Sequence, residues 1–158
     1  MTVMPYVTRI LPLRHPVRPT NGNHSAQPVH PFDLRIIAAS CSNCLLIGPD
    51  ALVDDALTAL EPLFRHAPVY LNGRQQLELP SSSREGTFVV RDVGELTASQ
   101  QEALSSWIES APGRFQVVST AAAPIWPAVE ARLFLASLYY RLNTMTIPLV
   151  ASANGGSG

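Results

Sequence analysis

The stretch Gly86-Thr-Phe-Val-Val-Arg-Asp-Val-Gly-Glu-Leu96 decides the fold of this 158-residue chain. Within it, residues 87–91 are rich in β-branched and aromatic side chains, which is typical of a short buried strand. Directly afterwards, Thr97 and Gln100 have the spacing of a capping box and predict the start of a helix. An apolar strand that leads at once into an amphipathic helix is the repeating unit of a parallel α/β sheet.

The same alternation of apolar runs and amphipathic stretches continues from residue 33 onward. Apolar residues recur at helical spacing over residues 50–64, and a further helix is expected over most of residues 127–143. Four more strands are predicted at residues 44–48, 69–71, 115–119 and 145–149. The predicted fold is therefore α/β, with a parallel sheet of about five strands between two layers of helices.

Two sets of side chains are expected in the core. In the helix that follows Thr97, the predicted buried face consists of Ala103, Leu104, Trp107 and Ile108. In the sheet, the residues expected to be buried on central or near-central strands are Leu46, Val89, Val118 and Ile147.

Composition divides the chain into three parts. Residues 1–32 contain six of the fourteen prolines and no acidic residue, so they are predicted to be a flexible Pro/Arg-rich tail. Residues 33–150 are predicted to form one α/β domain, because 46% of the chain is hydrophobic and only 15% is charged. Residues 151–158 are predicted to be a flexible Gly/Ser tail.

The charged residues restrict the possible functions. The formal net charge is −1, so direct DNA binding is not favoured. All eleven cationic side chains are arginine, which excludes any chemistry that requires a lysine of this chain. The sequence shows neither a secretory signal nor an apolar run long enough to span a membrane, so a cytoplasmic location is expected.

Cys41 and Cys44 are the only cysteines, and their spacing is found in redox and metal sites. A closed zinc site would need two further ligands, and no histidine stands at a finger-like spacing to a partner. A thioredoxin-type motif would begin a helix, whereas this one leads into the apolar run Leu45-Leu-Ile47. The favoured interpretation is two small residues that lead into a core strand.

Two segments together resemble the AAA+ domain of sigma-54-dependent transcriptional activators. Residues 86–96 resemble the family's Walker B region, G-T-L-F-L-D-E-I-G-E-L. The run Phe134-Leu-Ala-Ser-Leu-Tyr-Tyr-Arg-Leu-Asn143 resembles the family's F-R-E-D-L-Y-Y-R-L-N, and Ile147-Pro-Leu149 follows it as the family's last strand does. The resemblance covers residues 32–149 and implies a P-loop NTPase-like core that holds nucleotide at one edge of a parallel sheet.

The phosphate loop implied by this resemblance is degenerate. The family's G-E-S-G-T-G-K-E falls on residues 48–55, where only Gly48 is retained. Val53 replaces the last glycine, Asp54 replaces the phosphate-binding lysine, and Asp55 follows it. Carboxylates at that place would repel a triphosphate, so we interpret these acids as residues that stabilise a helix N-terminus.

The other catalytic positions of the family have also changed. The Walker B acid pair falls on Arg91 and Asp92, and an arginine can neither bind magnesium nor polarise water as an acid does. A register that makes Asp92 the metal ligand would break the match of the following Gly-Glu-Leu. The family's sensor asparagine would fall in residues 120–123, which contain none, and its first finger arginine falls on Leu135.

Tyr140 and Arg141 are the candidate subunit contact, because the family directs the arginine at the second position toward a neighbour's nucleotide. An arginine suits that role because its planar guanidinium stabilises spread phosphate charge. The alternative is that Arg141 forms an ion pair with an acid of its own chain.

The resemblance and the substitutions predict a non-catalytic, AAA+-like module linked to bacterial transcription regulation, without a bound cofactor or metal. Its expected partner is a protein, either an active AAA+ activator or a second copy, and not a membrane. The family's helical lid and helix-turn-helix would follow residue 149, and about nine residues follow it here, so a truncated member is expected. Two alternatives stay open: a residual ATP-binding domain with weak or no hydrolysis, and a redox or metal regulator that uses Cys41 and Cys44.

Overall fold

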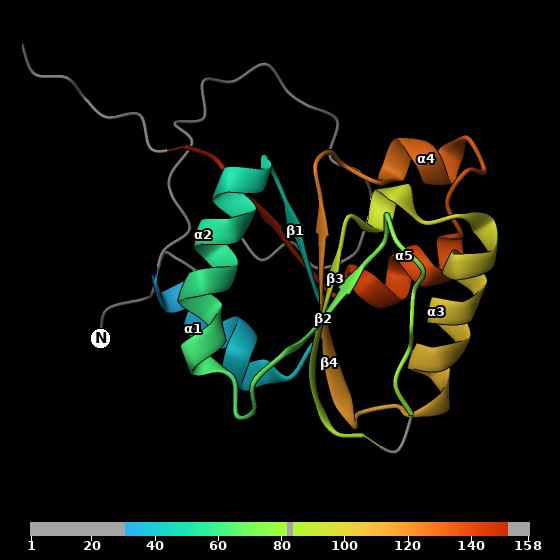
Figure 1. The fold of residues 1–158 in the computed structure, drawn as a ribbon. Helices are drawn as coiled ribbons and strands as arrows, with labels where there is room; N and C mark the ends of the chain where they lie inside the picture. Colours follow the sequence, from blue (N-terminus) through green and yellow to red (C-terminus); the bar gives the residue numbers. More distant parts are fainter. Residues whose placement is uncertain (1–30, 82–83, 152–158) are drawn as a thin grey trace, which may run out of the picture.

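The computed structural model describes residues 31–81 and 84–151, and these contain one parallel sheet (Figure 1). The strand order is β2-β3-β4-β1-β5, and every neighbouring pair is parallel. The strands are β1 (Cys44–Ile47), β2 (Val69–Asn72), β3 (Gly86–Arg91), β4 (Phe115–Ala121) and β5 (Met145–Pro148). The α/β class and the five-stranded parallel sheet predicted from the sequence are confirmed.

Helices cover both faces of this sheet, as the predicted three layers require. On one face lie α1 (Pro31–Ser40) and α2 (Asp50–Leu60), and on the other lie α3 (Ala98–Ser110), α4 (Trp126–Glu130) and α5 (Ala136–Leu142) (Figure 1). The 3-10 turns η2 (Glu61–Leu63) and η3 (Val93–Glu95) extend the connections after α2 and after β3. Within the described residues, no helix has the length and apolar character that a membrane span requires.

Each face of the sheet has its own apolar core. Leu46, Val89 and Val118 are fully buried on the side of α1 and α2, as predicted from the sequence. Ile147 is also buried, but it lies on β5, and β5 is an edge strand rather than a central one. The apolar pattern predicted that the Ile147 side chain is buried, but it does not indicate the place of β5 in the sheet, which depends on the strands that bond to it.

Helix α1 was not predicted from the sequence. It begins at Pro31, two residues before the predicted start of the domain, while residues 1–30 of the predicted N-terminal tail and residues 152–158 of the C-terminal one lie outside the described residues. Leu34 and Ile37, three positions apart, are buried against the sheet. Gln116 on β4 donates hydrogen bonds to the carbonyls of Ile37 and Ser42, at 2.7 and 2.8 Å, and so ties α1 to the sheet.

The long helix predicted over residues 127–143 is interrupted. It is divided into α4 and α5, and Arg132 between them has a left-handed backbone with φ of 58°. The carbonyl of Ala128 accepts hydrogen bonds from the main-chain N–H groups of both Leu133 and Phe134, at 2.8 and 3.1 Å, which closes the turn. The prediction of helix over most of residues 127–143 is confirmed by α4 and α5, but the turn between them was not predicted, because it is stabilised by a residue of another helix.

That residue is Gln101 on α3, which is 4% exposed. Its side-chain N–H₂ donates to the carbonyls of Leu96 and Leu133, at 3.0 and 3.1 Å, and its carbonyl accepts the N–H of Leu135 at 2.7 Å. The predicted capping box of Thr97 and Gln100 is confirmed at the start of α3. The predicted buried face is correct except for Ala103, which is exposed because α3 turns Gln101 and Ser105 inward instead.

Candidate functional site

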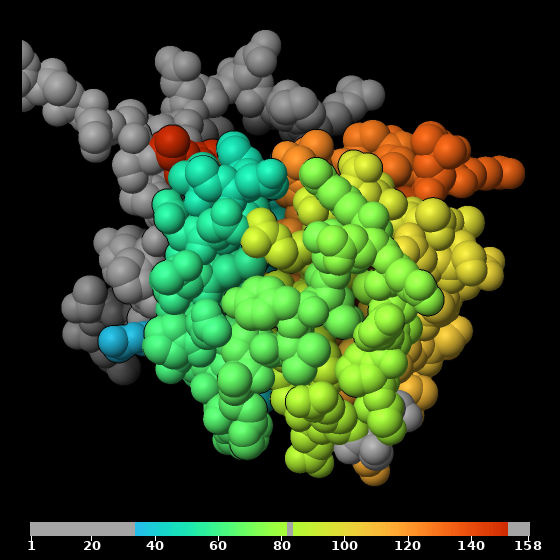
Figure 2. All heavy atoms as spheres, viewed as in Figure 1, coloured from blue at the N-terminus to red at the C-terminus, as the bar shows by residue number. Residues whose placement is uncertain are grey.

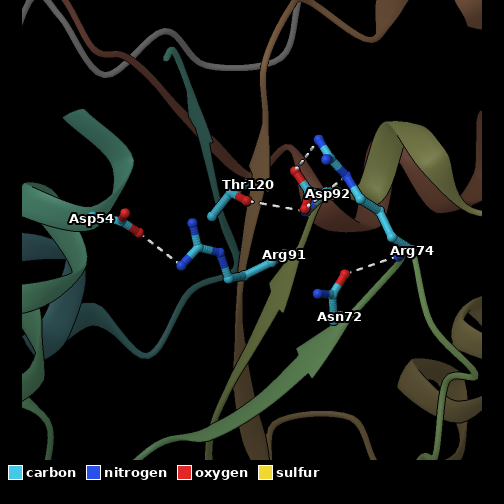
Figure 3. Close-up of polar contacts among 6 residues, drawn as sticks. All are labelled: Asp54, Asn72, Arg74, Arg91, Asp92 and Thr120. Atoms are coloured by element: carbon cyan, nitrogen blue, oxygen red, sulfur yellow. Dashed lines mark hydrogen bonds and ion pairs between the residues drawn. The ribbon is translucent and has the colours of Figure 1, made fainter. Parts of the chain in front are cut away.

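The predicted site residues gather at the carboxyl ends of the strands, where the resemblance implies a nucleotide. Gly48 follows β1, Arg91 ends β3, and Asp92 follows it, while Asp54 projects from α2 toward this edge (Figure 3). The positions therefore come together in space as the resemblance implies, and their chemistry depends on what each side chain contacts.

The connection between β1 and α2 consists only of Gly48 and Pro49. The sequence alignment placed Val53, Asp54 and Asp55 at the end of an eight-residue phosphate loop, whereas the structure places all three inside helix α2. The helix begins directly after Pro49, so no extended loop surrounds a space for phosphates. The predicted degenerate Walker A segment is therefore a short turn followed by a regular helix.

The main-chain N–H groups of this turn are largely occupied. Gly48 donates to the carbonyl of Ala121 at 3.0 Å, and Pro49 has no N–H. Leu52 and Val53 both donate to the carbonyl of Pro49 at 3.0 Å. A phosphate cradle requires several N–H groups that converge on the anion, and most of those in this turn are bonded to the protein itself.

Gly48 is explained by packing. An added Cβ at this position would lie 2.8 Å from the Cβ of Leu149 and 2.9 Å from its carbonyl oxygen. Leu149 itself donates its N–H to Ile47 at 2.7 Å, directly beside Gly48. The glycine retained from the family motif therefore allows the chain after β5 to approach the end of β1 closely.

Asp54 and Arg91 form an ion pair across this edge of the sheet. The Nη1 atom of Arg91 lies 2.7 Å from Oδ1 of Asp54, and the two side chains are 31% and 56% exposed (Figure 3). The sequence resemblance aligns these positions with the family's phosphate-binding lysine and metal-binding aspartate, and by that alignment the two charges are exchanged here. Helix α2 contains three acids, Asp50, Asp54 and Asp55, and only Asp50 lies in its first turn. The interpretation of Asp54 as a residue that stabilises the helix N-terminus was therefore wrong.

Asp92 is also engaged within the chain. Its two carboxylate oxygens lie 3.2 and 3.4 Å from the Nε and Nη2 atoms of Arg74, and its N–H donates to Thr120 Oγ1 at 3.1 Å (Figure 3). Gly73 allows the chain after β2 to lie close to the main chain of Asp92, because a Cβ at position 73 would lie 2.5 Å from the Asp92 carbonyl oxygen. Arg74 is a site residue that the sequence analysis missed, and nothing in its local pattern indicates a partner eighteen positions away.

Asp92 has a left-handed backbone with φ of 54°. Aspartate tolerates this conformation better than most residues. Thr120, in the segment where the family's sensor asparagine would fall, is 2% exposed and fixes the Asp92 main chain. In the alternative register Asp92 would be a magnesium ligand, but its carboxylate is already bonded to Arg74.

Tyr140 and Arg141 lie on α5, away from the Asp54–Arg91 pair. Arg141 forms an ion pair with Glu109 of α3, which is the alternative that the sequence analysis named for it. Tyr140 is 51% exposed and contacts the rings of Tyr139 and Trp126, with centroids 5.5 and 6.4 Å away. The first finger position, Leu135, is an exposed apolar residue at the start of this helix.

Cys41 and Cys44 differ in their environments. Cys44 is buried on β1 between β4 and β5, and desolvation by burial raises the pKa of its thiol to about 12. Cys41 is exposed, with φ of 53°, in the connection before β1. A thiol with so high a pKa is a poor nucleophile and a poor metal ligand at neutral pH. Among residues 31–81 and 84–151, no three His, Cys, Asp or Glu side chains are grouped to hold a metal ion.

Comparisons with known proteins agree with the geometry of the fold. In structure the chain is similar to NtrX from Brucella abortus in complex with ATP, with a TM-score of 0.62 and 11% identity over 81% of this chain and 38% of that one. It is also similar to a RuvB variant from Thermotoga maritima, with a TM-score of 0.55 and 15% identity over 75% of this chain and 43% of that one. At these identities the similarity establishes the fold alone, and this chain spans less than half of either solved chain.

The P-loop NTPase domain of the Sigma-54 transport activator from E. coli is similar over nearly all of its own length. The TM-score is 0.51 and the identity 17%, over 69% of this chain and 97% of that one. No curated protein sequence matches the chain.

The sequence profile of the Sigma-54 interaction domain matches residues 66–151, which is just over half of the chain. The match includes the two segments on which the sequence resemblance depends, residues 86–96 and 134–149. It begins after β1 and α2, so it does not include residues 48–55, the segment that the sequence resemblance aligns with the phosphate loop. The chain has the α/β fold of P-loop NTPases and belongs to the Sigma-54 interaction domain family.

Proposed function

We propose that this chain is a non-catalytic member of its family, a pseudo-ATPase that serves as a protein-interaction module in transcription regulation. The observation that carries the proposal is the ion pair between Asp54 and Arg91. It puts a carboxylate where the family binds phosphate, and a guanidinium where the family binds magnesium. Each group is neutralised by the other, so neither needs a nucleotide or a metal as its counter-charge.

Three further features support this proposal. The chain contains no lysine that could reach the β- and γ-phosphates. The Gly48 N–H is bonded to Ala121, and the Asp92 carboxylate is bonded to Arg74. Phosphoryl transfer depends on positioning and charge stabilisation by such groups, so their engagement elsewhere supports the proposal of a non-catalytic member.

We expect millimolar ATP with magnesium to leave the melting temperature of the protein unchanged. A ligand present at one hundred times its dissociation constant adds about 2.7 kcal/mol to stability, which raises the melting temperature by several degrees. The measurement is differential scanning fluorimetry with ATP, ADP and no nucleotide. An active ATPase domain of the same family, with its lysine intact, is the positive control. A saturable rise for this chain would favour the alternative of residual ATP binding.

We further propose a cytoplasmic protein partner, which contacts the surface of α4 and α5. Three apolar residues are exposed there: Leu133, Leu135 and Tyr140, at 75%, 37% and 51%. This surface contains the family's Tyr-Tyr-Arg-Leu-Asn segment, and the candidate partners are an active AAA+ activator and a second copy of this chain. Arg141 can act in trans only if it leaves Glu109, so Tyr140 is the stronger contact candidate.

Combined replacement of Leu133 and Tyr140 by alanine is expected to weaken partner binding at least tenfold, because exposed tyrosine and leucine side chains lose their buried contact area. Binding to a sigma-54-type ATPase is measured by titration calorimetry, and self-association by analytical ultracentrifugation. Tyr70→Ala, which removes an exposed tyrosine on β2, is the matched control. Unchanged binding in the double variant would contradict the assignment of this surface. ATPase turnover with Arg141→Ala then separates a role in trans from a structural ion pair.

A further inference from the structure

An open cavity with polar and apolar walls lies at the amino ends of the strands, at the edge of the sheet opposite the Asp54–Arg91 pair. Its volume is about 260 Å³. In Figure 2 this region is the notch at the lower edge of the molecule, between the connection from α2 to β2 and the start of β3. The residues that line it come from four segments: Ala38 and Cys41; Phe64, Arg65 and His66; Glu85, Gly86 and Thr87; and Gly113, Arg114, Phe115 and Gln116.

The charged groups of this cavity are two arginines and one acid. Arg65 and Arg114 line it from two different segments, and Glu85 is the only acid among the lining residues, which also include His66. The ion pairs among the described residues involve Arg74, Arg91 and Arg141, and neither cavity arginine takes part in one. Both guanidinium groups therefore have donors available for a ligand.

Two glycines at the rim of the cavity leave open space for a ligand. Gly86 and Gly113 have φ of 138° and 76°, and a Cβ at either position would meet no heavy atom within 4 Å. The buried Gln116 closes the cavity from the sheet side, since its side chain is bonded to Ile37 and Ser42. A small ligand therefore has access to the cavity and meets a fixed polar wall.

We propose that this cavity binds a small oxyanion of the phosphate or carboxylate type, with Arg65 and Arg114 as its main ligands. Guanidinium groups bind such anions through paired, charge-assisted hydrogen bonds. His66 adds a further donor, while Glu85 opposes the anion and limits its affinity. The inference is independent of the proposed pseudo-ATPase function, because no residue of the Asp54–Arg91 edge lines this cavity.

The rival explanation is that the two arginines compensate the carboxyl ends of α1 and α3, which point to the same edge of the sheet. Cations near a helix C-terminus stabilise the helix through its dipole. The two explanations differ in their dependence on ligand. If an arginine only stabilises a helix end, its removal lowers the stability of the protein by the same amount with and without an oxyanion. If it binds the oxyanion, its removal also reduces the stabilisation that the oxyanion produces.

The test is a titration of the full chain with inorganic phosphate at constant ionic strength, followed by melting temperature and by two-dimensional NMR. We expect saturable binding, with amide shifts concentrated at Gly86, Thr87 and Gly113. Arg65→Ala and Arg114→Ala are expected to weaken binding at least tenfold, since each removes a charge-assisted donor. Arg35→Ala, an exposed arginine on α1 outside the cavity, is the matched control.

Glu85→Gln is a second variant that tests the site even if an arginine variant fails to fold. Because it removes the opposing charge, it is expected to tighten phosphate binding severalfold, an effect that a purely structural role of the cavity would not produce. Acetate in place of phosphate shows whether the carboxylate class is also bound. The proposal is overturned if phosphate up to about 50 mM gives no saturable response, or if the arginine variants bind it as the unmodified chain does.

Discussion

Replacing Phe88 with alanine is expected to lower the free energy of unfolding by about 3–5 kcal/mol. Phe88 is 1% exposed on β3, and its ring makes edge-to-face contacts with Trp107 and Phe115, with centroids 4.9 and 5.4 Å away. Trp107 and Phe115 are themselves stacked at 4.2 Å, so the three rings form one cluster under α3. The substitution removes the shared member of this cluster and leaves a cavity between the sheet and the helix.

The loss is measured by urea unfolding, followed by circular dichroism and tryptophan fluorescence. Leu133→Ala is the control, because Leu133 is 75% exposed and its loss is expected to change stability by less than about 0.5 kcal/mol. A domain of this size has a total stability of about 5–15 kcal/mol, so Phe88→Ala removes a large part of it. A loss below about 1 kcal/mol would mean that the aromatic cluster is not closely packed.

Gly48→Ala is expected to destabilise the nucleotide-free protein by about 1–3 kcal/mol, because the added methyl group overlaps the chain after β5. Its Cβ would lie 2.8 and 2.9 Å from the Cβ and carbonyl oxygen of Leu149. The main chain cannot yield easily, since Gly48 and Leu149 are bonded to Ala121 and Ile47. A glycine retained for phosphate binding would instead leave the stability of the nucleotide-free protein nearly unchanged.

Gly94→Ala is the matched control for this effect. A Cβ at Gly94 would meet only the terminal Cδ1 atom of Ile125, at 3.3 Å, and a side-chain end can move by a few tenths of an ångström. Both variants are compared by chemical unfolding in buffer without nucleotide. Equal stability of Gly48→Ala and the unmodified chain would show that the β1–α2 turn tolerates a side chain and that its glycine has another role.

The ion pair between Asp54 and Arg91 is the basis of the proposed pseudo-ATPase function. An exposed ion pair of this kind contributes only about 0.2–1 kcal/mol, so it is a weak stabilising feature of the fold. Its significance lies in electrostatics, because each charge has the sign opposite to that which nucleotide and magnesium would require. A substitution of one partner alone would leave an unpaired charge at the edge of the sheet.

The sequence by itself determined the strands, the start of α3 and the family. The alternation of apolar runs and amphipathic stretches predicted the five strands, and Thr97 with Gln100 predicted the start of α3. The resemblance of residues 86–96 and 134–149 to the family is confirmed by the profile match. These features are readable because strand alternation, helical spacing and capping depend on residues within a few positions of one another.

Only the tertiary structure decided which distant groups meet. Asp54 and Arg91 come from different elements, and Arg74 after β2 pairs with Asp92 after β3. Gln101 of α3 accepts the N–H of Leu135 at the start of α5. Such contacts depend on the order of the strands in the sheet, which places residues far apart in the sequence side by side. The alignment with the phosphate loop placed Asp54 at this edge of the sheet. It could not identify Arg91 as the counter-ion of Asp54, because the local pattern around a residue contains no information about a distant partner.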